Sequence, residues 1–215
     1  MTDLAAVLFD MDGTLVESES MWHEAEIRTM EHFGCSWTEA DRDISVGGPF
    51  ERVVEYMSDK IGNDPGHVAR EMVTEIETMM ATRKLPIQPG VVELYRQVVA
   101  ADIPTALVSN SWRVLMNLVL ESVDLRFDVT IAGDEVSVPK PDPRPYVKAC
   151  EMLNVSPVDC VVLEDSNTGV ASATAAGCAV VAVPGVNTIE SAPRRLVVSS
   201  LVEVDLADLR MLVDS

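Results

Sequence analysis

Polar side chains recur at one kind of position in this sequence, the end of an apolar run or the loop just after it. They are Asp10 and Asp12, Ser109 and Asn110, Lys140, and Glu164 and Asp165. Taken alone, each suits a structural role, because acids before glycine favour turns and a serine or an acid can cap a helix. Acids and a lysine gathered at one place would be costly without a cation that neutralises the carboxylates. Their joint placement therefore favours a chemical site.

This set of side chains suits phosphoryl transfer. Carboxylates from two strand ends form a hard-oxygen site of the kind that Mg²⁺ prefers. Such an ion and Lys140 would neutralise a phosphoryl group, while the Ser109 hydroxyl and backbone N–H groups would hold its remaining oxygens. One carboxylate can attack phosphorus and form an acyl phosphate. A second carboxylate two residues on can protonate the leaving oxygen and later activate water.

An alternation of apolar runs and helical patterns positions these groups. The runs predict strands near 4–9, 104–108, 129–132, 161–163 and 179–183. Helical patterns follow the Pro-rich stretch at 84–90 and stand near 90–101, 112–121, 144–153 and 168–176. Strands that alternate with helices in this way form parallel βαβ units, and their carboxyl ends meet at one edge of the sheet. Open α/β sheets bind ligands at that edge.

The segment between the first two strands carries only helical patterns. Residues 15–87 show apolar spacings of three and four, with Ser18 or Ser20 as the expected helix cap. The expected fold class is α/β, with a Rossmann-like parallel sheet covered by helices on both faces and an inserted all-helical cap domain. The core comprises residues 1–15 and 88–215, and the cap comprises residues 16–87. An insertion at the end of the first strand lies over the ligand edge, so it would act as a lid.

Composition limits the partners of the chain. The hydrophobic fraction is 47%, which is typical of a globular protein. The net charge is −19, so the chain should repel nucleic acid and anionic membrane surfaces. The four cysteines form no CxxC pair, and no apolar stretch reaches the length of a membrane span. The N-terminal apolar run has no preceding Lys or Arg, unlike a secretory signal. We expect a cytoplasmic monomer that binds a small phosphorylated metabolite.

Four ordered segments, FDMDGT, LVSNS, VPKPDP and LEDSNTG, resemble the motifs of the haloacid dehalogenase superfamily. They are most similar to its subgroup with a helical cap after the first motif, which contains phosphatases and phosphomutases. The resemblance implies that Asp10 is the nucleophile and a metal ligand. It implies that Asp12 is the general acid and base, with its backbone carbonyl on Mg²⁺. True dehalogenases lack an acid at the position of Asp12 and need no Mg²⁺, so dehalogenation is disfavoured.

The same resemblance assigns the remaining core residues. It implies phosphate contacts by Thr14, Ser109, Asn110 and Lys140. It implies that Asp165 is the principal fourth-motif metal ligand, with Glu164 beside it as a ligand or a neighbour of one. The expected activity is a Mg²⁺-dependent hydrolysis of small phosphomonoesters, such as sugar or polyol phosphates, through an aspartyl phosphate.

A β-phosphoglucomutase-like enzyme is the alternative to a phosphatase. Because such a mutase would share every core motif, only the residues of the cap distinguish the two. Such mutases carry a histidine early in the first cap helix and basic residues flanking the glycine of the cap loop. Here Trp22 stands at the histidine position with His23 one residue later, and Val46 precedes Gly47. These departures favour a phosphatase, although a register shift of one residue would restore His23. Phe50 falls roughly where a cap arginine would help a mutase.

Several side chains are candidates for substrate contact. They are Trp22, Val46, Phe50, Arg52 and Arg113. His23 is expected on the helix surface instead. A non-catalytic binding protein on the same fold is a further alternative, because fold does not fix function. Such a protein would be expected to lose one of the core acids or Lys140, and all are present.

Overall fold

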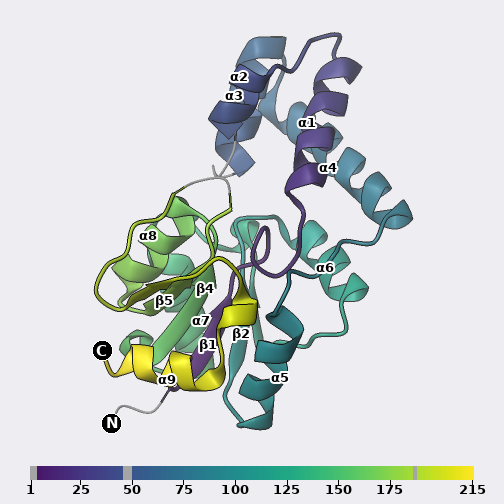
Figure 1. Cartoon of the computed structure of the whole chain (residues 1–215). Helices are drawn as coiled ribbons and strands as arrows, with labels where there is room; N and C mark the ends of the chain where they lie inside the picture. The colour runs from purple at the N-terminus through teal and green to yellow at the C-terminus, as the bar shows by residue number, and fades with distance from the viewer. Residues whose placement is uncertain (1–3, 46–49, 186–187) are drawn as a thin grey trace.

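Six parallel strands form one sheet at the centre of the computed structural model, which describes residues 4–45, 50–185 and 188–215 (Figure 1). The order across the sheet is β3-β2-β1-β4-β5-β6. The strands are β1 (Ala6–Phe9), β2 (Thr105–Val108), β3 (Val129–Ile131), β4 (Cys160–Glu164), β5 (Ala179–Ala182) and β6 (Arg195–Val197). The predicted α/β class with a parallel sheet is confirmed. Strand β6 was not predicted, because it begins at an arginine and its apolar run, residues 196–198, is only three residues long.

Helices cover both faces of the sheet. One face packs against α5 (Val91–Ala100), α6 (Arg113–Ser122) and α9 (Leu206–Val213), and the other against α7 (Arg144–Leu153) and α8 (Asn167–Ala176). Successive strand residues alternate between the two layers, since Val7 and Phe9 join one apolar cluster while Ala6 and Leu8 join the other. The strands are therefore apolar throughout, as parallel strands buried on both faces must be.

Four helices lie between β1 and α5 in the part of this segment that the structure describes, residues 10–45 and 50–90. They are α1 (Glu19–His32), α2 (Glu39–Ser45), α3 (Phe50–Ile61) and α4 (Pro65–Thr82). Buried methionines, among them Met30, Met57 and Met72, fill the space between them. Helix α2 was missed from the sequence because its residues, EADRDIS, carry no apolar period. Nowhere in the described chain is a helix both long and apolar enough to cross a membrane.

Two chain segments join this helical part to the sheet, and they run side by side. Val16 and Ile87 form an isolated antiparallel bridge. The backbone N–H of Glu17 donates to the Pro86 carbonyl at 2.8 Å, and that of Gln88 donates to the Leu15 carbonyl at 2.9 Å. Because both connections lie together, the four helices stand above the carboxyl ends of the strands on a double linker (Figure 1).

Candidate active site

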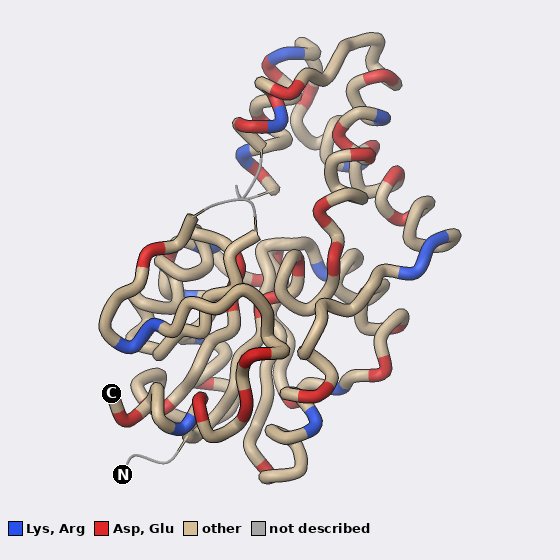
Figure 2. The backbone as a smooth tube through the Cα atoms, in the orientation of Figure 1, with Lys and Arg blue, Asp and Glu red and all other residues tan. Residues whose placement is uncertain are grey.

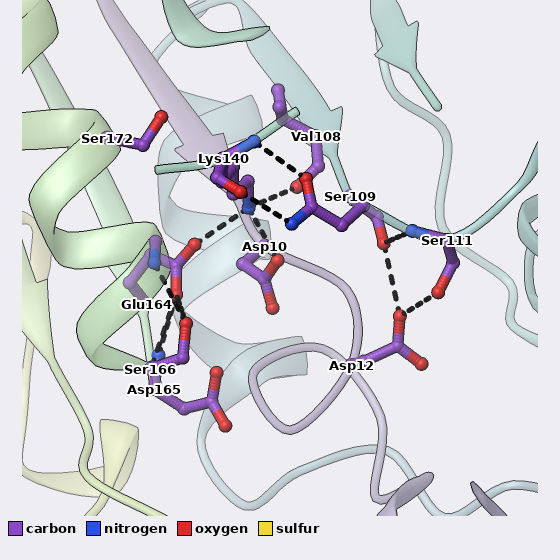
Figure 3. A network of polar contacts seen from close by, with 12 residues as sticks. Asp10, Asp12, Val108, Ser109, Ser111, Lys140, Glu164, Asp165, Ser166 and Ser172 are labelled. Atoms are coloured by element: carbon purple, nitrogen blue, oxygen red, sulfur yellow. Dashed lines mark hydrogen bonds and ion pairs between the residues drawn. The ribbon is translucent and has the colours of Figure 1, made fainter. Parts of the chain in front are cut away.

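Lys140 lies at the centre of the polar network at the carboxyl ends of β1, β2 and β4 (Figure 3). Its ammonium group donates to Asp10 Oδ1 at 2.7 Å, to Glu164 Oε1 at 2.7 Å and to the Val108 carbonyl at 2.8 Å. Lys140 is 2% exposed and Glu164 is fully buried. One buried cation therefore holds side chains from two strands and the backbone of a third.

The carboxylates in this network carry more negative charge than one ammonium group balances. Burial, with the charge of Glu164 added to it, raises the pKa of Asp10 to about 8 although Lys140 opposes the shift. Burial and the charge of Asp10 raise the pKa of Asp165 to about 9. Burial alone would lower the pKa of Lys140, but the facing carboxylates raise it above its ordinary value. Such a cluster is suited to a further cation.

The donor set fits a hard divalent cation. Asp10, Glu164 and Asp165 each offer a carboxylate oxygen, and these oxygens lie within 4.8 Å of one another. Carboxylate oxygens at this spacing suit Mg²⁺. Glu164 accepts five hydrogen bonds from Lys140, Tyr146 and the Asp165–Ser166 segment. Asp10 and Asp165 are therefore the better candidates for direct ligands, with Glu164 as the group that holds Lys140 and the Asp165 backbone in place.

Two glycines let the backbone approach these carboxylates. A Cβ on Gly13 would lie 2.1 Å from Asp165 Oδ2, and the φ of Gly13 is +87°. A Cβ on Gly169 would lie 1.7 Å from Glu164 Oε1. Both distances are far below van der Waals contact, so the DMDGT turn and the first turn of α8 in the LEDSNTG motif require glycine at these positions.

Asp12 is held by four donors from two parts of the chain. Ser18 Oγ at 2.7 Å and Trp22 Nε1 at 2.9 Å donate to its Oδ1. Ser109 Oγ at 3.1 Å and Ser111 Oγ at 2.6 Å donate to its Oδ2. Ser18 does stand at the N-cap position of α1, but its hydroxyl makes no cap bond. The start of α1 and the end of β2 together fix this carboxylate beside the Asp10 cluster.

The other core candidates have different contacts. Ser109 Oγ also accepts from the Ser111 N–H at 2.9 Å. The side-chain amide of Asn110 pairs with the Lys140 backbone, accepting at 2.9 Å and donating at 3.2 Å. Asn110 therefore positions Lys140, and any phosphate contact would have to come from its backbone. The buried Thr14 hydroxyl has no hydrogen-bond partner among the described residues.

A cavity of about 190 Å³ lies between this network and the helical segment. Asp10, Asp12 and Lys140 line its core side. Trp22 and Phe50 line its helical side, with ring centres 5.8 Å apart. The cavity is smaller than the roughly 300–1,000 Å³ of drug-sized ligand sites, which limits its contents to a small molecule.

The other predicted substrate contacts have different positions. Arg113 donates to Glu135 and Thr130, and it is not among the described residues that line the cavity. The structure therefore does not support substrate contact by Arg113. Arg52 is exposed and donates to the Ile44 carbonyl, also outside the lining. Val46 lies outside the described residues.

Several polar residues of the cavity were not predicted from the sequence. His23, expected on the helix surface, lines the cavity. Glu19, Glu26 and Arg42 also line it from α1 and α2. Ser111 bonds Asp12, and its place in the LVSNS motif was the signal that could have revealed it. For His23 the one signal was the histidine position of the mutases, one residue earlier. For Glu19, Glu26 and Arg42 no motif existed, because their position depends on how α1 and α2 pack.

The chain is similar to known hydrolases and phosphatases. The family model that matches residues 7–183 describes haloacid dehalogenase-like hydrolases. The chain is 32% identical over 175 residues to the validoxylamine A 7'-phosphate phosphatase of Streptomyces hygroscopicus subsp. limoneus, covering 79% of this chain and 81% of the relative. It is 30% identical over 217 residues to hexitol phosphatase B of Escherichia coli K12, covering 96% of both.

A solved structure of similar shape comes from Rhodobacter sphaeroides. It is a crystal structure of a mutant of CbbY in complex with xylulose-(1,5)bisphosphate, with a TM-score of 0.84 and 26% sequence identity. The match covers 96% of this chain and 99% of that one.

Proposed function

The chain belongs to the haloacid dehalogenase-like hydrolase family, and from this premise we propose that it hydrolyses small phosphorylated sugars or polyols through a phosphorylated Asp10. Relatives named as phosphatases, matched over most of their length, make it a phosphoric monoester hydrolase. The observation that carries the proposal is the buried contact of Lys140 with both Asp10 and Glu164 at the edge of the cavity. This contact holds a carboxylate where a phosphoryl group can enter.

Asp10 is the proposed nucleophile. Lys140 holds its Oδ1, so Oδ2 is the atom that would attack phosphorus and form an aspartyl phosphate while the bond to the leaving oxygen breaks. Lys140 carries a positive charge beside the reacting oxygens and offsets the charge that develops on them.

Asp12 is the proposed general acid and base. It would give a proton to the leaving oxygen in the first step and take one from the attacking water in the second. The second step breaks the bond between Asp10 and phosphorus and releases inorganic phosphate. The donors from Ser18, Trp22, Ser109 and Ser111 keep the carboxylate in one orientation beside the cavity.

Mg²⁺ is the proposed cofactor. Asp10 and Asp165 would hold it, with Glu164 beside them, and the raised pKa values of both aspartates support a cation at this place. When bound, the ion would supply charge neutralisation for the phosphoryl group.

Residues 16–87 are proposed to act as a cap over the site. The double linker at Val16 and Ile87 would let the four helices tilt as a unit, and the cavity between them and the sheet would admit substrate and water. Trp22 also supports a phosphatase over a mutase. It occupies the position of the mutase histidine, and its indole N–H is engaged with Asp12.

A substrate panel tests the proposal. Purified protein with Mg²⁺ is expected to release inorganic phosphate from sugar and polyol monophosphates. Isomerisation of β-glucose 1-phosphate, measured in the same samples, is expected to be far slower than release. Mass spectrometry of the protein quenched in acid during turnover should find a phosphoryl group on Asp10. Isomerisation faster than phosphate release would identify a mutase instead.

A further inference from the structure

Four polar residues of α1 and α2 form one side of the cavity, which we call the cap wall. They are Glu19, His23, Glu26 and Arg42. The proposed hydrolysis uses none of them, since the reacting groups all come from the strand ends. Their side chains nevertheless face the space that the leaving group of a substrate would occupy. The composition of the cap wall therefore bears on which leaving groups the cavity accepts.

Glu26 is a buried acid with no basic partner other than a histidine. It is 6% exposed, and burial raises its pKa. Its Oε2 accepts from Trp37 Nε1 at 3.0 Å and lies 3.7 Å from His23 Nδ1. No Lys or Arg of the described chain forms an ion pair with it. A buried carboxyl group without a cation is costly unless hydrogen-bond donors surround it.

His23 presents a polar atom that lacks a partner. Its Nδ1 is buried and makes no hydrogen bond with the described residues. His23 Nδ1 and Glu26 Oε2 lie 3.7 Å apart, too close for a hydroxyl group to lie between them, but a hydroxyl group beside the pair would accept from the one and donate to the other. Buried polar atoms normally have partners, so a ligand hydroxyl at this place would remove a deficit.

Arg42 is the only arginine or lysine of the cap wall, and it is already paired. Its Nη2 lies 3.4 Å from Glu19 Oε1. The pair leaves the cap wall with Glu26 as its remaining acid and no cation in excess among the described residues. A second anionic group on a substrate would lose its hydration here without finding a free positive charge.

We infer that the cap wall selects phosphomonoesters with uncharged, polyhydroxylated leaving groups and rejects substrates that carry a second phosphate or a carboxylate. Glu26 and His23 bind leaving-group hydroxyls, and the Glu19–Arg42 pair keeps the wall from attracting anions. This selectivity rests on the proposed phosphatase function and adds to it the class of leaving group and the residues that choose it.

Two substrates that differ by one phosphate group test the inference. For the wild-type protein, kcat/KM for fructose 6-phosphate should exceed that for fructose 1,6-bisphosphate at least about tenfold, because like charges brought together oppose binding. Phosphoglycolate should resemble the bisphosphate, and sorbitol 6-phosphate should resemble the monophosphate. p-Nitrophenyl phosphate, measured with Mg²⁺, reports whether hydrolysis itself occurs.

Three variants locate the selectivity. Glu26→Gln removes the buried acid, and Glu19→Gln frees Arg42 by a change on a half-exposed side chain that does not threaten folding. Each should lower the ratio of kcat/KM for fructose 6-phosphate to kcat/KM for fructose 1,6-bisphosphate by about three- to tenfold. Glu31→Gln makes the same charge change on the same helix, at an exposed position outside the cavity lining. It should leave the ratio at its wild-type value.

The outcomes separate this inference from the proposed function. If the wild-type protein hydrolyses both fructose phosphates equally well, or if neither Glu19→Gln nor Glu26→Gln alters the ratio, the cap wall does not select. The same holds if Glu31→Gln narrows the ratio as much as they do, because net charge would then be the cause. If no phosphate is released even from p-nitrophenyl phosphate, the proposed function itself fails.

Discussion

The strand-end edge of the sheet and the cap wall face each other across one cavity, but they hold their polar groups differently. At the strand-end edge Lys140 and Glu164 are 2% and 0% exposed, and Lys140 makes three contacts of 2.7–2.8 Å. In the cap wall the side chains of Arg42 and Glu19 are 40% and 43% exposed and form one contact of 3.4 Å. The proposed chemistry thus uses a fixed network, while the proposed selection combines the buried Glu26 with the half-exposed pair of Glu19 and Arg42, which can adjust.

The acidic side chains also differ between the strand-end edge and the cap wall. Figure 2 shows acidic positions along both the sheet part and the helical part of the chain. At the strand-end edge the acids converge on one buried lysine, whereas Glu26 in the cap is buried without a Lys or Arg partner. The convergent carboxylates at the strand-end edge are close enough to hold one metal ion, whereas Glu26 is not part of such a group among the described residues.

Asp10→Asn is expected to have the largest effect, since it removes the nucleophile from the fixed network. Turnover of any phosphomonoester should fall at least about a thousandfold. Thermal melting should remain cooperative, because asparagine has the same shape and can still accept from Lys140. A variant that keeps a tenth of wild-type activity would show that Asp10 is not the nucleophile and that the strand-end edge does not hold the chemistry.

Removal of divalent ions is expected to rank next. EDTA should lower phosphate release at least about a hundredfold, and Mg²⁺ should restore it. A second measurement is independent of turnover: Mg²⁺ at about 100 times its Kd should raise Tm by roughly 5–10 °C, because it relieves repulsion between Asp10 and Asp165. Asp165→Asn is the matched control, and its Tm should respond much less. Full activity in EDTA would contradict the proposed metal site.

Trp22→Phe tests whether a side chain of the helical segment affects the proposed chemistry at the strand-end edge. The indole of Trp22 comes from α1 but donates to Asp12 at 2.9 Å. Loss of that donor should lower kcat/KM for alkyl phosphates about tenfold, since their leaving groups need a well-placed acid. p-Nitrophenyl phosphate, whose leaving group needs little protonation, should lose less than about threefold.

A matched control is available in the same aromatic cluster. Trp112 packs on Phe50 with ring centres 4.8 Å apart, and its indole donates to Glu51 at 3.3 Å. Trp112→Phe therefore makes the same change without touching Asp12. If it reproduces the leaving-group dependence of Trp22→Phe, the effect belongs to cap packing and not to the orientation of the acid.

The sequence predicted the strand-end edge much better than the cap wall. Asp10 and Asp165 follow apolar strands, and parallel strands bring their carboxyl ends to one edge. Lys140 comes instead from a loop beyond β3, and the Asn110 side chain holds its backbone at that edge. Ser18 shows where such reasoning fails, because it was expected to cap α1 and instead donates to Asp12. Whether a hydroxyl caps its own helix or bonds a residue of another segment is decided by tertiary packing.

The cap wall was hidden for a related reason. Helix α2 has no apolar period, and it is held by Asp41, which accepts from Thr38, Tyr56 and Lys60. Thr38 and Asp41 form a capping box at the start of α2, which is a local signal of a helix. Tyr56 and Lys60 lie 15 and 19 residues from Asp41, and their contacts leave no local pattern. The capping box could therefore have revealed where the helix begins, but the positions of Arg42 and His23 in the cavity lining depend on how the helices pack.

Loss of one tyrosine hydroxyl in each region is expected to have the smallest effects on activity. The pair of variants tests whether the cap opens separately from the sheet part. Tyr56 OH donates to Asp41 at 2.6 Å within the cap, and Tyr95 OH donates to the Arg126 carbonyl within the sheet part. Tyr56→Phe and Tyr95→Phe should each cost about 1–2 kcal/mol of hydrogen-bond free energy. If the cap opens separately from the core, hydrogen exchange should speed up only in α2 and α3 for Tyr56→Phe.

Tyr95→Phe should instead lower Tm by about 2–8 °C, because its bond stabilises the unit that unfolds globally. Both variants should keep kcat/KM for p-nitrophenyl phosphate within about twofold, since neither residue lines the cavity. Equal acceleration of exchange throughout the chain by both variants would mean that cap and core unfold as one cooperative unit. Selection would then be as rigidly held as the chemistry, and the adjustable cap wall would have to be abandoned.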